Sequence, residues 1–252
     1  MIALLLCAMM VRQAQDDPAS ASAIETFNKA WSKDKTSDGR ASAVTELAKV
    51  QYEKVCGKLS SLLTSEDKGV RIAAATGLGT FASPELKKSA SKGLCSGLTA
   101  GANSNDPDVK IAILAALGTL NEETSAAKVR DHFDEKDNKI ASAAVTAAGN
   151  IKNKTLVEPL IEVLKECEQE IKKATTLPQG IPGKAGKLPA PSKKAPVGPA
   201  NDPEKVKRDR ANALLGPSQT ALCTITGQGS LKTSEEFEKW WSKNRNTFNP
   251  AK

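Results

Sequence analysis

One motif recurs along the chain and constrains the fold more than any other feature of the sequence. A copy that begins at Asp67 (DKGVRIAAATGLGTF) lines up with a copy that begins 39 residues later at Asp106 (DPDVKIAILAALGTL). A third copy begins 31 residues further on at Asp137 (DNKIASAAVTAAGNI), and a fainter one covers residues 40–48. Units repeated every 20–50 residues or so are typical of solenoids, propellers and arrays, in which neighbouring units bury one another's apolar faces.

Each copy predicts a helix followed by a second helix. After Val109, apolar residues recur three, four, seven, eight and eleven positions later, which is the spacing of one face of an α-helix. Asp106 supplies a side-chain acceptor for the first free amides, and Pro107 suits the first helical position. Second amphipathic helices are predicted at residues 52–63, 84–98, 125–133 and 156–167. Repeated helix pairs of this kind stack into an α-solenoid.

A glycine stands near the end of the first helix in each clear copy, at positions 79, 118 and 149. Glycine adopts a positive φ without steric strain, and many helices end at a residue in that conformation. We therefore predict that the chain turns with positive φ at Gly79, Gly118 and Gly149.

The composition favours an all-α fold and argues against several function classes. Hydrophobic residues make up 39% of the chain and aromatic residues only 4%, so the core must consist of Ala, Leu, Val and Ile. Sandwiches and barrels, which use aromatic and β-branched strands, are disfavoured. The single histidine, His132, argues against histidine-based catalysis and histidine-rich metal sites; with acids beside it, it is interpreted as part of a polar face.

The recurring pattern D-x-x-V-[RK]-x-A-A…A-L-G-x-L resembles HEAT repeats, in particular the short bacterial repeats of phycobilisome lyases. The resemblance spans residues 36–170 and implies an armadillo-like α-solenoid of about four hairpins over residues 21–175. It implies a scaffold for protein binding, whereas a lyase activity would rest on fold analogy alone. The third copy has Ala141 where Arg71 and Lys110 stand. The basic position is therefore interpreted as a surface charge or a link between adjacent repeats.

The first eleven residues form an uninterrupted apolar run. The run is shorter than the roughly 20 residues that span a bilayer, but it has the length of a signal-peptide core. Small residues at 19–21 fit a cleavage site. Residues 1–20 are thus predicted to be a signal peptide and spacer of a protein exported to the periplasm or beyond. The alternative is a first helix of a cytoplasmic protein; no other segment predicts a membrane span.

The net charge of +7 is concentrated in one segment. Residues 184–210 contain three acidic residues and eight basic ones, namely Lys184, Lys187, Lys193, Lys194, Lys205, Lys207, Arg208 and Arg210. Residues 176–203 are rich in Pro, Gly and Lys and are predicted to be a disordered linker. The basic segment predicts an alternative function, binding of nucleic acid or another anionic polymer. Aromatic residues that could stack on bases are absent from it, which argues against that alternative.

Residues 204–252 are predicted to form C-terminal helices. Asp202 and Pro203 repeat the cap-then-proline pattern and predict a helix to about Leu215. Residues 220–226 are either the end of a helix or a short strand, and we favour the helix.

The last predicted helix carries two of the three tryptophans of the chain. Thr233 and Glu236 have the spacing of a capping box, and Phe237, Trp240 and Trp241 follow. This ending resembles that of exported bacterial HEAT-repeat proteins. An end repeat must cover its apolar face, so the Trp pair is interpreted as a cap; an aromatic anchor for a partner is the alternative.

No pattern predicts catalysis, a cofactor or a metal site. Residues 77–82 match a dinucleotide-binding pattern, but a helix instead of a strand precedes them, and residues 180–187 resemble a P-loop with the wrong spacing. The cysteines lack zinc-site spacing; they are Cys7, Cys56, Cys95, Cys167 and Cys223. Buried thiols are favoured for them, with a disulfide or a reactive thiol as alternatives.

The sequence thus predicts a non-enzymatic scaffold that binds another protein along the stacked second helices. The candidate contact residues are Lys88, Lys92, Lys128, Glu162 and Lys165 on these helices, with Trp240 and Trp241 near the C-terminus.

Overall fold

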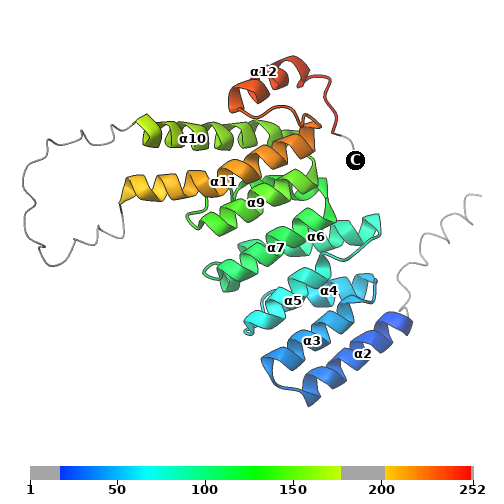
Figure 1. Cartoon of the computed structure of the whole chain (residues 1–252). Coiled ribbons are helices and arrows are strands. Elements are labelled where there is room, and N and C mark those ends of the chain that lie inside the picture. The colour runs from blue at the N-terminus through cyan, green and yellow to red at the C-terminus, as the bar shows by residue number, and fades with distance from the viewer. Residues whose placement is uncertain (1–17, 177–201, 251–252) are drawn as a thin grey trace, which may run out of the picture. The chain divides into compact units, whose positions relative to one another are not determined.

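The computed structural model describes residues 18–176 and 202–250. Within these ranges the regular secondary structure is entirely helical, which confirms the predicted all-α fold (Figure 1). The predictions for the apolar run at 1–11 and for most of the linker lie outside the described residues. The helices are α2 (Pro18–Lys33), α3 (Ser37–Ala48), α4 (Glu53–Leu62), α5 (Lys68–Leu78), α6 (Pro84–Thr99), α7 (Pro107–Leu120), α8 (Ala126–Arg130), α9 (Asn138–Ile151), α10 (Val157–Thr176), α11 (Pro203–Thr226) and α12 (Ser234–Asn244). The chain divides into two compact units, which separate between Ser125 and Ala126.

In the first unit, helix hairpins stack in two layers. Helices α3, α5 and α7 pack side by side, and α4 packs against α6 (Figure 1). We call α3, α5, α7 and α9 the first helices, because each begins a hairpin, and α4, α6, α8 and α10 the second helices. Helix α2 packs mainly on α3. This stacking of hairpins is the arrangement that the repeated motif predicts.

The second unit contains one hairpin more than the motif copies predict. Helix α11 packs along both α9 and α10, and α12 packs on α10 (Figure 1). Helix α11 thus extends the layer of α9, and α12 extends the layer of α10. The predicted C-terminal cap therefore has the same hairpin arrangement as the repeats that it covers.

Helix α11 is longer than predicted. It continues without a break from Pro203 to Thr226, so the predicted end near Leu215 is wrong, while the helix favoured for residues 220–226 is confirmed. Pro217 lies inside this helix and removes one backbone donor. The helix continues because its apolar face is buried on α9 and α10 over both halves.

The glycine prediction is wrong. Gly79 has φ −66°, and Gly118 and Gly149 lie inside their helices with ordinary φ values. Helices α7 and α9 instead end at Asn121 and Lys152, both with φ 52°. Asparagine tolerates this conformation well, and at Lys152 the hairpin connection imposes it.

Two of these glycines allow close approach between stacked first helices. A Cβ on Gly149 would lie 2.9 Å from the Cα of Ala221, and one on Gly79 would lie 3.1 Å from the Cα of Ala116. Both distances are shorter than ordinary contacts between carbon atoms, which are about 3.5–4.0 Å. The glycines are thus needed for packing between helices rather than for turning.

The core consists mainly of aliphatic side chains, as the composition indicates. In the first unit Val70, Ala74 and Leu78 line the inner face of α5 with no exposed surface. Few aromatic residues join them; Phe81 and Phe237 are the largest fully buried side chains. Alanine at many contact positions lets the helices pack closely.

Candidate partner-binding surface

The charged side chains are unevenly divided between first and second helices. Beyond their first four residues α5, α7 and α9 contain no charged residue, and exposed positions there carry Thr76, Ala115 and Thr146, whereas α3 keeps Glu46. The second helices carry charges further along: α4 to Lys58, α6 to Lys92 and α10 to Lys173. Among the described residues the large hydrophobic side chain that stays exposed is Val206, on α11, which is 56% exposed. A partner of the second helices would therefore meet mainly polar and charged groups.

Lys88 and Lys92 are both exposed on α6, one helical turn apart. Within the described ranges neither ammonium group forms an ion pair or a hydrogen bond. These two predicted contact residues therefore share one helix face and keep their charges available to a partner.

A groove of about 410 Å³ runs between α4 and α6, and of these two lysines Lys92 lines it. Lys92 and Gly93 line one side, and Gly57 and Ser60 line the other. At the groove, the Ser89 hydroxyl of α6 donates a 2.8 Å hydrogen bond to the carboxylate of Glu53 on α4. The sequence alone does not reveal this groove, because its width depends on the distance between two helices that are separate in the sequence.

The second unit holds the remaining candidates on second helices. Lys128 on α8 and Glu162 on α10 are exposed, and the ammonium of Lys128 lies 3.8 Å from the carboxylate of Asp131. Lys165 on α10 forms a 2.7 Å ion pair with Glu238 of α12. The hydrogen bond with Glu238 raises the pKa of Lys165. Lys165 is thus available only in part, because its charge also joins α10 to α12.

The two tryptophans differ in their surroundings. Trp241 is 9% exposed, and its Nε1 donates a 3.0 Å hydrogen bond to the carboxylate of Glu158 on α10. Trp240 is half-buried, stacks on Trp241 at 6.2 Å between ring centroids and meets the edge of Phe248 at 5.2 Å. Trp241 therefore packs α12 onto α10, while Trp240 presents part of its ring to solvent.

A third contact holds the start of α12. The carboxylate of Glu168 on α10 accepts hydrogen bonds from the Ser234 backbone N–H at 3.0 Å and from its hydroxyl at 2.6 Å. The capping box predicted at Thr233 and Glu236 is present. The N-terminus of α12 is thus held both by its own residues and by α10.

Arg71, at the basic position of the motif, links adjacent repeats. It is 7% exposed, and its guanidinium binds the carboxylate of Asp106 at 2.8 Å and the carbonyl oxygen of Ser65 at 2.7 Å. Partial burial works to raise the pKa of Asp106, but hydrogen bonds from Lys68 and Arg71 outweigh it, so the pKa is lowered. Of the two interpretations of Arg71, the link between repeats is the one that the geometry supports.

Residues 202–210 are the described part of the basic segment, and some of their basic side chains already bind other groups of the protein. Arg210 on α11 donates to the carbonyl oxygens of Phe133 at 2.5 Å and Glu135 at 2.6 Å, in the loop before α9. Lys207 lies 3.7 Å from the carboxylate of Glu204. Residues 184–201 of this segment lie outside the described residues.

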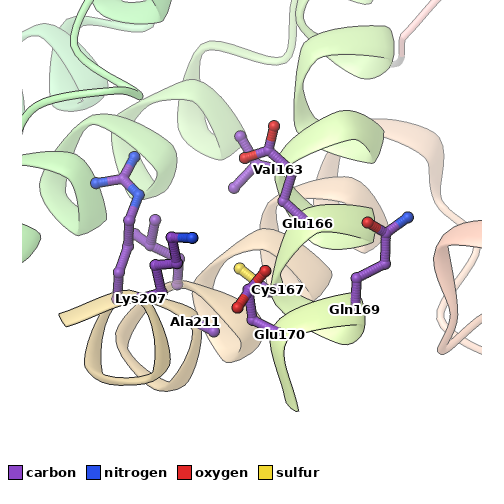
Figure 2. A pocket seen from close by; sticks show the side chains of 9 residues that line it. Val163, Glu166, Cys167, Gln169, Glu170, Lys207 and Ala211 are labelled. Atoms are coloured by element: carbon purple, nitrogen blue, oxygen red, sulfur yellow. The ribbon is translucent and has the colours of Figure 1, made fainter. Parts of the chain in front are cut away.

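A cleft of about 310 Å³ lies between α10 and α11 (Figure 2). Figure 2 shows Lys207 and Ala211 of α11 facing Cys167 and Glu170 of α10. Burial raises the pKa of Cys167 to about 11, so its thiol stays protonated at neutral pH and is a poor nucleophile. Glu170 is paired with Lys173 at 2.6 Å. The cleft therefore holds a mixed set of charges and no activated group.

No disulfide bond joins the four cysteines of the described ranges. Cys56 and Cys167 are buried, which confirms the prediction of buried thiols for these two; Cys95 and Cys223 are half-buried. Burial raises the pKa of Cys56 to about 11 as well. The thiols therefore act as small core side chains.

His132 contacts an acid but does not belong to a metal-binding cluster. Its Nδ1 lies 2.9 Å from the carboxylate of Glu135. In the part of the chain that the structure describes, no three His, Cys, Asp or Glu side chains gather as metal ligands would. Residues 77–82 lie at the end of helix α5 and in the following loop, so a strand does not precede them.

Over the same described ranges, no helix combines the length and the apolar character that crossing a membrane requires.

Comparison with known families identifies the repeats. The sequence model of HEAT repeats matches the chain twice, over residues 13–94 and 95–177. The two matches together cover more than half of the chain and include helices α3 to α9 entirely. No curated protein is significantly similar to the chain. The hairpin of α11 and α12 lies beyond the matched residues.

Proposed function

Since this chain belongs to the HEAT-repeat family, we propose that it is a non-catalytic scaffold that binds another protein along its second helices. HEAT repeats commonly serve as protein-interaction scaffolds, because stacked hairpins offer an extended surface. The observation that carries the proposal is the unequal division of charge between the two helix layers. Long charged side chains steer and orient a partner, whereas α5, α7 and α9 beyond their first turn present short uncharged side chains that offer few specific contacts.

The proposed contacts lie on the second helices and on α12, and all of them except the buried Trp241 are at least partly exposed. They are Lys88, Lys92, Lys128, Glu162, Lys165, Trp240 and Trp241. Lys88 and Lys92 support the proposal best because their charges are unpaired among the described residues. Trp241 contributes indirectly, since it holds α12 in place.

A tagged chain expressed in its own host tests the proposal. After cross-linking, captured proteins are identified by mass spectrometry at low and high salt, and the strongest partner is purified and its affinity measured. We expect Lys88→Glu with Lys92→Glu to weaken that affinity. Lys136→Glu with Lys139→Glu, which changes two exposed lysines elsewhere by the same charge, is the control.

Two outcomes contradict the scaffold proposal. Equal affinity of both double variants for the purified partner would exclude the second helices of the first unit as the binding surface. Capture of nucleic acid alone, lost at high salt, would assign the function to the basic segment at residues 184–210 instead.

We also propose that the protein is exported. The apolar run at residues 1–11 supports this proposal, and the small residues at 19–21, which fit a cleavage site, lie in the first turn of α2. Intact-mass measurement on protein purified from its host tests it. A mature chain that starts near residue 22 is the expected result, and a chain that retains Met1 would contradict it.

A further inference from the structure

We propose that the groove between α4 and α6 binds an extended acidic segment of the partner protein. In this arrangement carboxylates of the segment pair with Lys88 and Lys92, and its backbone lies over Gly57. The inference rests on the proposed scaffold function and names the chemistry of the partner.

The charges beside the groove favour an acidic partner. Among the residues that line the groove, Glu53 and Lys92 are the charged ones, and Lys88 is exposed one turn before Lys92 on α6. The carboxylate of Glu53 accepts a hydrogen bond from Ser89. Two ammonium groups therefore stand beside one carboxylate that already has a donor, so this face attracts carboxylates and repels lysine-rich segments.

The spacing of the lysines fits an extended chain. Residues one turn apart on a helix, such as Lys88 and Lys92, have Cβ atoms about 5–6 Å apart. In an extended peptide, alternate side chains point the same way and lie about 6.6 Å apart. Acidic residues at alternate positions of the segment can therefore meet both ammonium groups at once.

Gly57, which lines the groove, is not needed for packing between the helices, unlike the glycines on α6. Gly93 and Gly97 on α6 allow close packing, because a Cβ on Gly97 would lie 2.7 Å from Leu63 Cδ1, and one on Gly93 would overlap the Ser60 side chain. A Cβ on Gly57, within α4, would meet nothing within 4 Å. Glycine destabilises a helix interior relative to alanine, so Gly57 weakens α4 without a packing reason. Its missing side chain leaves room for the backbone of a bound segment.

The cleft between α10 and α11 fits an acidic segment less well. Its lining includes Glu166 and Glu170 as well as Lys207 and Arg210. Arg210 is already bound to two backbone carbonyl oxygens. An acidic ligand would meet two carboxylates there, against the single carboxylate of Glu53 at the groove between α4 and α6 (Figure 2).

Binding is tested on the full chain by fluorescence anisotropy with a labelled synthetic peptide in which Asp alternates with Ala. We expect this peptide to bind and a peptide of alternating Lys and Ala not to bind. Lys88→Glu with Lys92→Glu should lower the affinity by at least about tenfold, since it replaces attraction by repulsion at two positions. Lys136→Glu with Lys139→Glu should change it by less than about twofold.

The groove itself is tested by filling it. Gly57→Leu places a side chain in open space and should lower the affinity for the Asp-Ala peptide, whereas Ala115→Leu, on the exposed face of α7, should not. Circular dichroism and thermal unfolding of each variant show that the helices are intact.

The outcomes separate this inference from the scaffold proposal. Equal binding of the Asp-Ala peptide by both lysine double variants, or no binding at all, overturns the acidic-segment inference. If the natural partner nevertheless loses affinity for the variant with Lys88→Glu and Lys92→Glu, the scaffold proposal stands. If neither double variant changes the affinity for the natural partner, the scaffold proposal and the acidic-segment inference are both refuted. Tighter binding of a single-stranded DNA oligonucleotide, unchanged by Gly57→Leu, would replace the peptide with a nucleic acid.

Discussion

The guanidinium of Arg71, on α5, contacts the loop that precedes α5 and the residue that precedes α7. It binds the carbonyl oxygens of Ser65 and Glu66 and the carboxylate of Asp106, which precedes α7. One buried side chain therefore satisfies three acceptors and ties two hairpins together. In the third copy of the motif, Ala141 replaces this arginine, so that copy has no equivalent of this link.

We expect Arg71→Met to lower the free energy of unfolding of the first unit by about 3 kcal/mol. Among the described residues, the carboxylate of Asp106 then keeps only the partly exposed Lys68 as an ion-pair partner, and two carbonyl oxygens also lose a donor. Urea denaturation followed by circular dichroism measures the loss. Lys49→Met is the control, because its ion pair with Glu46 is exposed, and its midpoint should stay close to that of the native chain.

Gly57→Ala should raise the free energy of unfolding by about 0.5–1 kcal/mol, because alanine stabilises a helix interior and the added Cβ meets no atom. Gly93→Ala should lower it, since its Cβ overlaps the side chain of Ser60. Thermal unfolding of the two variants gives opposite shifts if both arguments hold. A destabilised Gly57→Ala variant would show that Gly57 serves helix packing after all.

At the scale of helices, α12 is attached to α10 by three kinds of contact. The ring of Trp241 is buried, Lys165 pairs with Glu238, and Glu168 binds the start of α12 at Ser234. These contacts explain how a helix with a largely charged sequence packs firmly at the end of the chain. They support the interpretation of Trp241 as part of a cap.

Trp241→Ala should release α12 from α10, because truncating a buried aromatic side chain costs about 3–5 kcal/mol. Hydrogen exchange followed by mass spectrometry measures the effect as faster exchange within residues 234–244. Trp240→Ala should leave most of the protection in place, since that ring is half-buried. Loss of partner binding in the Trp240 variant, with α12 still protected, would identify Trp240 as an anchor.

At the scale of the whole chain, ion pairs and hydrogen bonds shift the pKa values of many side chains in the direction that favours their charged forms. The pKa of Asp67 is lowered, first by its hydrogen bond from Ser37, and that of Glu236 is lowered by backbone N–H groups of Lys232 and Thr233. The pKa of Lys68 is raised, first by its hydrogen bond to Asp108. These networks make stability depend on pH.

Stability should therefore be highest on a plateau between the two titration ranges. Carboxyl groups with lowered pKa stabilise the folded chain above their ordinary values of 3.8 and 4.5, and this stabilisation is lost as pH falls through the folded values. Raised lysine pKa values contribute below 10.5, and that contribution is lost only as pH rises beyond it. Urea midpoints from pH 3 to pH 11 measure the curve. A urea midpoint that rises as the pH falls below these carboxyl pKa values would contradict the predicted loss of stability in acid.

Local features of the sequence determined the helices, their pairing and several of their ends. Apolar spacing, the cap-then-proline pairs and the capping box at Thr233 and Glu236 act over a few residues, so they are visible without a structure. The repeated motif also predicted that the hairpins stack, since each unit must cover the next one's apolar face. The exposed positions of Lys88 and Lys92 followed from the same helical spacing.

Tertiary structure alone decided what depends on distances between stacked helices. The link from Arg71 to Asp106 spans 35 residues, and the pair of Lys165 and Glu238 spans 73. Gly149 is needed where α9 and α11 approach closely, and Gly57 borders a groove whose width the packing of α4 and α6 sets. The physical reason is that a local pattern specifies which face of a helix is apolar, but only packing of complete side chains specifies how near two helices come and which groups meet.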